Sequence, residues 1–193
     1  MTTVYFVRHA QPNYDNHDDL SRELTPKGLR DRVLVTRFLM DKRIDAVLSS
    51  PYKRAVDTVA GFAEAAHLEI ETMEDFRERR MDSGWIADFE EFCRSQWADF
   101  DYKLSDGETL NEVQRRNIRA LNAVLARYDG KNIVIGSHGT ALSVIINHFD
   151  RSFGYAQFQQ IRNLMPWVVR FAFEDGLCRQ IQPYNLLAPG GAE

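Results

Sequence analysis

The stretch TVYFVRHAQ, residues 3–11, is the part of this sequence from which the fold can be worked out. Its apolar run is rich in branched and aromatic residues, which is typical of a strand buried on both faces of a sheet. The run ends in Arg8 and His9. A guanidinium group offers a planar fork of donors, and a neutral imidazole offers a lone pair that can attack phosphorus. The pair alone also fits a solvated arginine beside a hydrogen-bonded histidine, so a second signal is needed.

A second stretch, NIVIGSHG at residues 132–139, repeats this design: an apolar run delivers His138 to its end, and small residues then open a helix. A third short strand, predicted over residues 44–49, ends in SSP, and Arg54 follows in the first turn of the next helix. Strands alternate with helices through most of the chain, which predicts an α/β sandwich with a largely parallel sheet. In such sheets the carboxyl ends of the strands form the ligand crevice, so two arginines and two histidines should surround one pocket.

Length and composition are those of an ordinary globular domain. The chain has 193 residues, of which 44% are hydrophobic and 27% charged, and a single domain over residues 1–193 is expected. The net charge of -4 gives no general attraction to nucleic acid or to an anionic membrane. We also expect no signal peptide and no membrane span, a cytoplasmic location, and reduced, buried Cys93 and Cys178. A homodimer is left open.

Periodicity and caps predict the remaining elements. Thr25 and Pro26 should start a helix that reaches Lys42; its expected apolar face consists of Leu29, Val33, Phe38 and Leu39. Further helices are predicted over residues 51–66, 86–97, 110–129 and 140–147, a strand over 68–72, and a hairpin over 167–181 that turns at 174–176. The tail around residues 188–191 should be frayed.

Residues 74–107 differ in character from the rest. Aromatic side chains are scattered among charges there, and Gly84 interrupts the pattern. The spacing of Phe89, Phe92 and Trp97 indicates plain packing more than a ligand site. Because irregular segments carry specificity in many enzymes, we expect this insertion to shape the choice of substrate.

In their order along the chain, these motifs resemble those of the histidine phosphatase superfamily, whose fold is phosphoglycerate mutase-like. The resemblance covers residues 4–142 and implies a three-layer α/β/α sandwich with a mostly parallel mixed sheet. Its motifs are RHA at 8–10, which differs from the family's Arg-His-Gly by one methyl group, LTPKG at 24–28, SSPYKRA at 49–55 followed by Thr58, RER at 77–79, GET at 107–109 and SHG at 137–139.

The resemblance also implies the roles of individual residues. It gives catalytic roles to His9 as the nucleophile, to Glu78 as the general acid and to His138, and phosphate-binding roles to Arg8, Arg54, Asn13, Asn16 and Gly139. The position of the family's pocket asparagine is Asp15 here, so its two neighbouring asparagines are named instead. Glu74 remains the alternative acid, because the glycine that follows the family's acid is more distant here.

Several functions remain open at this point. The first is a phosphomonoester hydrolase that acts on a small phosphorylated substrate through a phosphohistidine intermediate, with no metal and no cofactor. The alternative is a cofactor-dependent phosphoglycerate mutase, although the segment 82–106 is acidic and would repel a bisphosphate. A non-catalytic phosphate-binding protein is a third reading. A metallohydrolase would have to use His9, His17, His138 and His148, whose spacing does not support a metal site.

Overall fold

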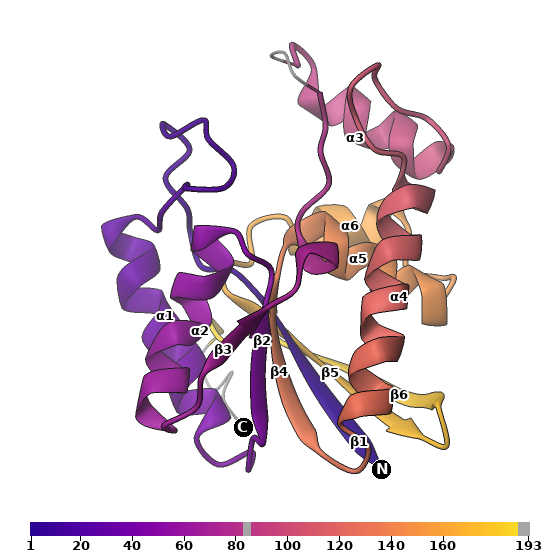
Figure 1. Cartoon of the computed structure of the whole chain (residues 1–193). Coiled ribbons are helices and arrows are strands. Elements are labelled where there is room, and N and C mark those ends of the chain that lie inside the picture. The colour runs from indigo at the N-terminus through magenta and orange to yellow at the C-terminus, as the bar shows by residue number, and fades with distance from the viewer. Residues whose placement is uncertain (83–85, 189–193) are drawn as a thin grey trace.

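The computed structural model describes residues 1–82 and 86–188 (Figure 1). One six-stranded sheet forms the centre, with the strand order β3-β2-β4-β1-β5-β6. Strands β3, β2, β4 and β1 pair in parallel, whereas β5 is antiparallel to β1 and β6 is antiparallel to β5. The strands are β1 (Thr2–Arg8), β2 (Ala46–Ser49), β3 (Ile70–Thr72), β4 (Asn132–Ser137), β5 (Trp167–Glu174) and β6 (Leu177–Tyr184).

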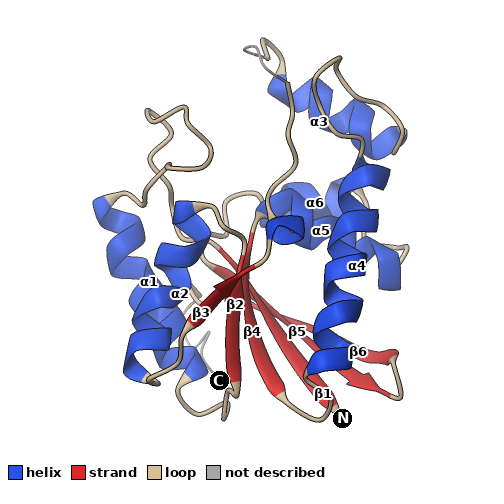
Figure 2. Cartoon of the chain, in the orientation of Figure 1, coloured by secondary structure: helices blue, strands red, loops and turns tan. Residues whose placement is uncertain are grey.

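Helices cover both faces of the sheet, which confirms the predicted three-layer sandwich (Figure 2). One face carries α1 (Pro26–Leu39) and α2 (Lys53–Ala65), and the other carries α4 (Leu110–Arg127), α5 (Gly139–Phe149) and α6 (Tyr155–Ile161). A short 3-10 helix, η1 (Glu74–Phe76), and α3 (Phe89–Ala98) belong to the irregular segment 74–107. In Figure 1, α3 and the loop before α1 both lie beyond the carboxyl ends of the parallel strands.

Strand β1 is buried on both faces because it lies inside the sheet, between β4 and β5. Val4 and Phe6 belong to the core beneath α4 and α5, while Tyr5 and Val7 belong to the core beneath α1 and α2. Successive side chains of a strand point to opposite faces, so the continuous apolar run fills two cores at once.

Several predicted details differ from the structure. Helix α1 ends at Leu39, and Leu29 and Val33 are each 44% exposed, so the prediction that they lie on its buried face is wrong. The residues of α1 that are buried are Gly28, Val35, Phe38 and Leu39, and the helix packs on α2. Because these residues form the buried face of the helix, the side chains of Leu29 and Val33 face solvent. Neither α6 nor η1 was expected from periodicity, because both span less than three turns.

The cysteines and the chain end complete the comparison. Both cysteines are free; Cys93 is buried, as expected, whereas Cys178 on the edge strand β6 is only half-buried. Gly84 and residues 189–191 of the predicted frayed tail lie outside the described residues. Among the helices described, none is long and apolar enough to cross a membrane.

Candidate active site

The two histidines predicted to share a pocket lie side by side. β1 and β4 are neighbours in the sheet, with Arg8 opposite Ser137, so His9 and His138 leave the sheet at the same edge. Their ring centroids are 5.3 Å apart and both side chains are buried. The sheet itself therefore sets the spacing of these two imidazoles.

His9 is held as a neutral imidazole. Its Nδ1 lies 2.8 Å from the carbonyl oxygen of Ala10, which can only accept, so the ring proton sits on Nδ1 and the lone pair on Nε2. Among the described residues, none hydrogen-bonds Nε2. Burial, with further contributions from the charges of Arg54 and Arg8, holds the pKa of His9 well below its usual range. The imidazole consequently keeps its lone pair at neutral pH.

Arg8 is held by the chain at the end of α6. Its guanidinium group donates to the backbone oxygens of Ile161, the last residue of α6, at 2.6 Å and of Leu164, just after that helix, at 3.3 Å. A Cβ on Gly139 would lie 3.1 to 3.2 Å from the same guanidinium, so the absence of a side chain there makes room for it. Burial lowers the pKa of Arg8, and its buried Nε has no hydrogen-bond partner. That orphan donor is available to an anion.

Arg54 brings the second guanidinium from the first turn of α2, and its side chain is 3% exposed. It donates to the backbone oxygen of Asp19 at 2.7 Å and lies 3.4 Å from a carboxylate oxygen of the same residue. Its guanidinium carbon also lies 5.0 Å from the ring centroid of Tyr52. Burial lowers the pKa of Arg54, and the charge of Asp19 opposes that shift.

The proton of His138 can be placed by counting hydrogen bonds. Its Nε2 lies 2.7 Å from the hydroxyl oxygen of Ser50, which also accepts from the backbone N–H of Tyr52 at 3.2 Å. If the Ser50 hydroxyl donates to Nε2, the Nδ1–H of His138 is the one group of this pair left without a partner. In the opposite tautomer, both the Ser50 hydroxyl hydrogen and the Nδ1 lone pair would be left without a partner. Burial, Arg54 and His9 hold the pKa of His138 well below its usual range, so the ring is neutral. Nδ1 is buried and has no partner.

Glu78 reaches the same pocket from the segment before α3. One carboxylate oxygen accepts from the backbone N–H of Thr140 at 2.9 Å, and the other from Ala141 at 3.1 Å and from Arg79 at 2.8 Å. The first two donors belong to the first turn of α5, directly after His138. The alternative acid, Glu74, is 71% exposed and pairs with Arg77 at 3.2 Å. This geometry favours Glu78 as the carboxyl group of the site.

A partly buried ion-pair network fixes the backbone that carries Glu78. Arg116 on α4 donates to the backbone oxygens of Asp75, Arg77 and Glu78 at 2.7 to 3.1 Å and pairs with Glu108 at 2.9 Å. Glu108 also accepts from the Arg77 side chain, at 2.6 Å. Burial would raise the pKa of Glu108, but these donors outweigh it and hold the pKa at about 2. The segment is thus pinned by charges that persist at neutral pH.

The two predicted asparagines are engaged inside their own loop. The side-chain amide nitrogens of Asn13 and Asn16 donate to the two carboxylate oxygens of Glu23, at 2.7 and 2.8 Å. These two hydrogen bonds lower the pKa of Glu23 to about 2. Their side-chain oxygens accept from the backbone N–H groups of Asp15 and Asp18. A role in phosphate binding stays a prediction for both.

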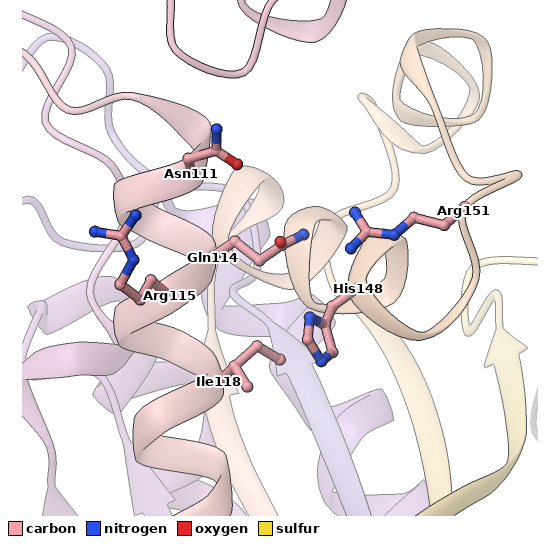
Figure 3. A pocket seen from close by; sticks show the side chains of 6 residues that line it. All are labelled: Asn111, Gln114, Arg115, Ile118, His148 and Arg151. Carbon is pink, nitrogen blue, oxygen red and sulfur yellow. The ribbon is translucent and has the colours of Figure 1, made fainter.

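A separate hollow of about 300 Å³ lies between α4 and α5, and it contains none of the predicted site residues (Figure 3). His148 and Arg151 point toward α4 there, whereas Arg115 points to the other side of its helix. Its cations therefore do not converge, and His148 stands apart from the strand-end histidines. Within residues 1–82 and 86–188, no three side chains of the metal-binding types cluster.

Three residues of the site were not singled out from the sequence. Ser50 lies within SSPYKRA, and Arg116 lies in none of the motifs. A serine after a strand and an arginine on a helix are both too common to mark a site. Asp19 lies in the polar loop before α1, between Gln11 and Thr25. Its contact with Arg54 depends on the path of that loop, which no local pattern encodes.

Comparison with known proteins agrees with this geometry. A family model described as "Histidine phosphatase superfamily (branch 1)" matches residues 4–182. An uncharacterized phosphatase, PhoE of Bacillus subtilis, is 27% identical over 96% of this chain and 95% of its own length. A protein described as a probable phosphoglycerate mutase, GpmB of Serratia proteamaculans, is 29% identical over 76% of this chain and 74% of its own.

Among solved structures, a phosphoserine phosphatase of Entamoeba histolytica in complex with phosphoserine has the same fold. Its TM-score is 0.75 at 20% identity, over 94% of this chain and 96% of that one.

Proposed function

Because the chain belongs to the histidine phosphatase superfamily, branch 1, we propose that it is a phosphomonoester hydrolase acting through a phosphohistidine intermediate on a small phosphorylated substrate. The observation that carries this proposal is the unpartnered Nε2 of the neutral, buried His9. The centroid of the His9 ring lies 5.3 Å from that of the neutral His138. A lone pair held free inside a cationic pocket is what a phosphoryl acceptor requires.

In the first step His9 Nε2 forms a bond to phosphorus while the bond from phosphorus to the ester oxygen breaks. The leaving oxygen takes a proton from the carboxyl group of Glu78. The loose transition state spreads charge over three equatorial oxygens. Arg8 and Arg54 supply positive charge and donors for them, and the neutral His138 supplies its Nδ1–H as a further donor. The backbone N–H groups of Thr140 and Ala141 at the start of α5 donate to the Glu78 carboxylate and hold it next to the strand end that carries His138.

In the second step water attacks the phosphorus and the bond from nitrogen to phosphorus breaks. The water proton returns to the Glu78 carboxylate, which restores the acid, and inorganic phosphate leaves. Both steps use the same residues, so one pocket completes the cycle. The insertion 74–107, whose α3 projects beyond the strand ends, would border the non-phosphate part of the substrate.

The test is a panel of phosphomonoesters without added metal, combined with rapid quenching to trap labelled enzyme. We expect release of phosphate from several substrates and an acid-labile label on His9. Protein that is folded but neither releases phosphate nor becomes labelled would support the reading as a non-catalytic phosphate-binding protein.

A mutase is the second candidate, and the similarity to GpmB is the observation that favours it. Both reactions pass through phospho-His9, so the label cannot separate them. Supplying 3-phosphoglycerate with catalytic 2,3-bisphosphoglycerate does separate them. Efficient isomerisation with little free phosphate would establish the mutase, whereas net release of phosphate supports the hydrolase.

A further inference from the structure

The loop before α1 places a carboxylate against one of the two arginines of the phosphate pocket. Asp19 lies 3.4 Å from a terminal nitrogen of Arg54, and its backbone oxygen accepts from the other at 2.7 Å. The two partners differ in exposure: the side chain of Arg54 is 3% exposed and that of Asp19 is 42% exposed. The carboxylate therefore stands between solvent and the buried cation.

Hydrogen bonds on both sides of Asp19 hold this position. Arg22 donates to the Asp19 carboxylate at 2.8 Å and to the backbone oxygen of Asn16 at 2.7 Å. The backbone oxygen of Leu20 accepts from the N–H of Lys53 at the start of α2. The loop is thereby tied to the helix that carries Arg54, and the carboxylate is a built part of the pocket rim.

We propose that Asp19 is a specificity-determining residue, which selects phosphomonoesters whose alcohol part carries no second anionic group. This inference rests on the proposed phosphatase function and names its substrate class. Arg54 must bind an incoming phosphoryl group while it already pairs with the carboxylate of Asp19. Repulsion between like charges only a few ångströms apart, partly screened by solvent, then weakens binding of every anion, and of a doubly anionic substrate most.

The arrangement still leaves enough attraction for one phosphoryl group. Arg8 forms no ion pair with any carboxylate in the described part of the chain, and its hydrogen bonds go to backbone oxygens. Arg54 has five N–H donors, of which Asp19 uses only part. The pocket thus keeps its hold on the phosphoryl group, while the loop, with Asp15, Asp18, Asp19 and Glu23 against Arg22, makes the approach acidic.

The test compares Asp19→Asn with Asp18→Asn. Both variants remove one negative charge from the same loop, but the Asp18 side chain bonds Ser21 and the N–H of Leu20. Asparagine keeps the size of Asp19 and leaves its backbone contact with Arg54 in place. The substrates are glycerol 3-phosphate and 3-phosphoglycerate, which differ chiefly by a hydroxymethyl group in place of a carboxylate. The binding probe is inorganic phosphate, titrated calorimetrically.

For Asp19→Asn we expect phosphate to bind about tenfold more tightly and the preference for glycerol 3-phosphate over 3-phosphoglycerate, as a ratio of kcat/KM, to shrink about tenfold. Asp18→Asn should change both by less than about twofold. Unchanged phosphate affinity in a folded Asp19→Asn protein, or equal shifts in both variants, overturns the proposal.

Phosphate titration keeps the two proposals apart. If no phosphomonoester of the panel is hydrolysed and no label is trapped, the proposed function fails, but tighter phosphate binding by Asp19→Asn still supports the role of Asp19 at the anion site. If Asp19→Asn melts well below the wild type, Asp19→Ser takes its place in the same titration. If the wild type hydrolyses the substrates and neither Asp19 variant changes the phosphate affinity, only the proposed role of Asp19 is contradicted.

Discussion

The sheet edge and the loops around it hold their parts of the site in different ways. His9, His138 and Arg54 are nearly fully buried, and their positions follow from two strand ends and one helix start. Asp19 and Glu78 come from irregular segments and are placed by individual hydrogen bonds to backbone groups and arginines. From this difference we expect the sheet to set the attack on phosphorus, and the loops to set the protonation of the leaving group and the choice of substrate.

The largest effect should come from the sheet edge. His9→Ala removes the atom that we propose takes the phosphoryl group, so we expect turnover to fall by at least about 10³-fold. His148→Ala is the control, since that histidine lies in the hollow between α4 and α5. Rates are measured on an aryl phosphate with protein purified free of host phosphatases. Substantial turnover by His9→Ala would remove the nucleophile from the mechanism.

The next largest effect should come from Glu78, the loop residue that we propose protonates the leaving group. Glu78→Gln should slow alkyl phosphates by about 10²-fold and nitrophenyl phosphate by much less, because a poor alkoxide leaving group needs a proton and nitrophenolate hardly does. The matched control is Glu74→Gln, which alters the exposed alternative acid. Equal losses on both substrates would mean that Glu78 positions the pocket and donates no proton.

The same contrast explains what could be predicted from the sequence. The apolar runs that end in Arg8-His9 and in Ser137-His138 place both histidines at one sheet edge, because parallel strands end together. The placement of α1 was only partly right, since Leu29 and Val33 are apolar yet exposed, and periodicity alone does not say which of two apolar stripes a neighbour covers.

The loop contacts depend on pairs distant in sequence. Asp19 meets Arg54 and Arg116 meets the backbone of residues 75–78, and neither pair has a local signature. The amides of Asn13 and Asn16 are bonded to Glu23, an arrangement that the family resemblance did not imply. Such contacts need the path of the chain, which composition and periodicity leave open.

A smaller effect should follow from removing the hydrogen bond that fixes the tautomer of His138. Ser50→Ala removes the hydroxyl that lies 2.7 Å from Nε2, so the proton can leave Nδ1, and we expect kcat/KM to fall about tenfold, the equivalent of one hydrogen bond. The neighbour Ser49, whose buried hydroxyl has no partner, gives the control Ser49→Ala, with less than about twofold change.

Nitrogen-15 shifts of His138 report the tautomer directly and distinguish it from general loss of packing. Ser50→Thr keeps a hydroxyl group and should restore both the shift pattern and most of the rate. A wild-type spectrum with the proton on Nε2 would contradict the assignment, whatever the kinetics show.

The smallest expected effect is that of metal removal, which asks whether the sheet edge supplies all the positive charge the reaction needs. Phosphoryl transfer requires positive charge around the equatorial oxygens, and many enzymes obtain it from divalent cations. Here Arg8 and Arg54 offer two guanidinium groups, and a divalent cation placed between them would be repelled. We therefore expect kcat/KM to change by less than about twofold after exhaustive treatment with EDTA, and added magnesium to restore nothing.

Loss of activity in EDTA that a divalent ion reverses would show that the arginines alone do not suffice. The outcome also bears on the loop, because an essential cation would neutralise Asp19 and remove the repulsion on which its proposed selectivity depends.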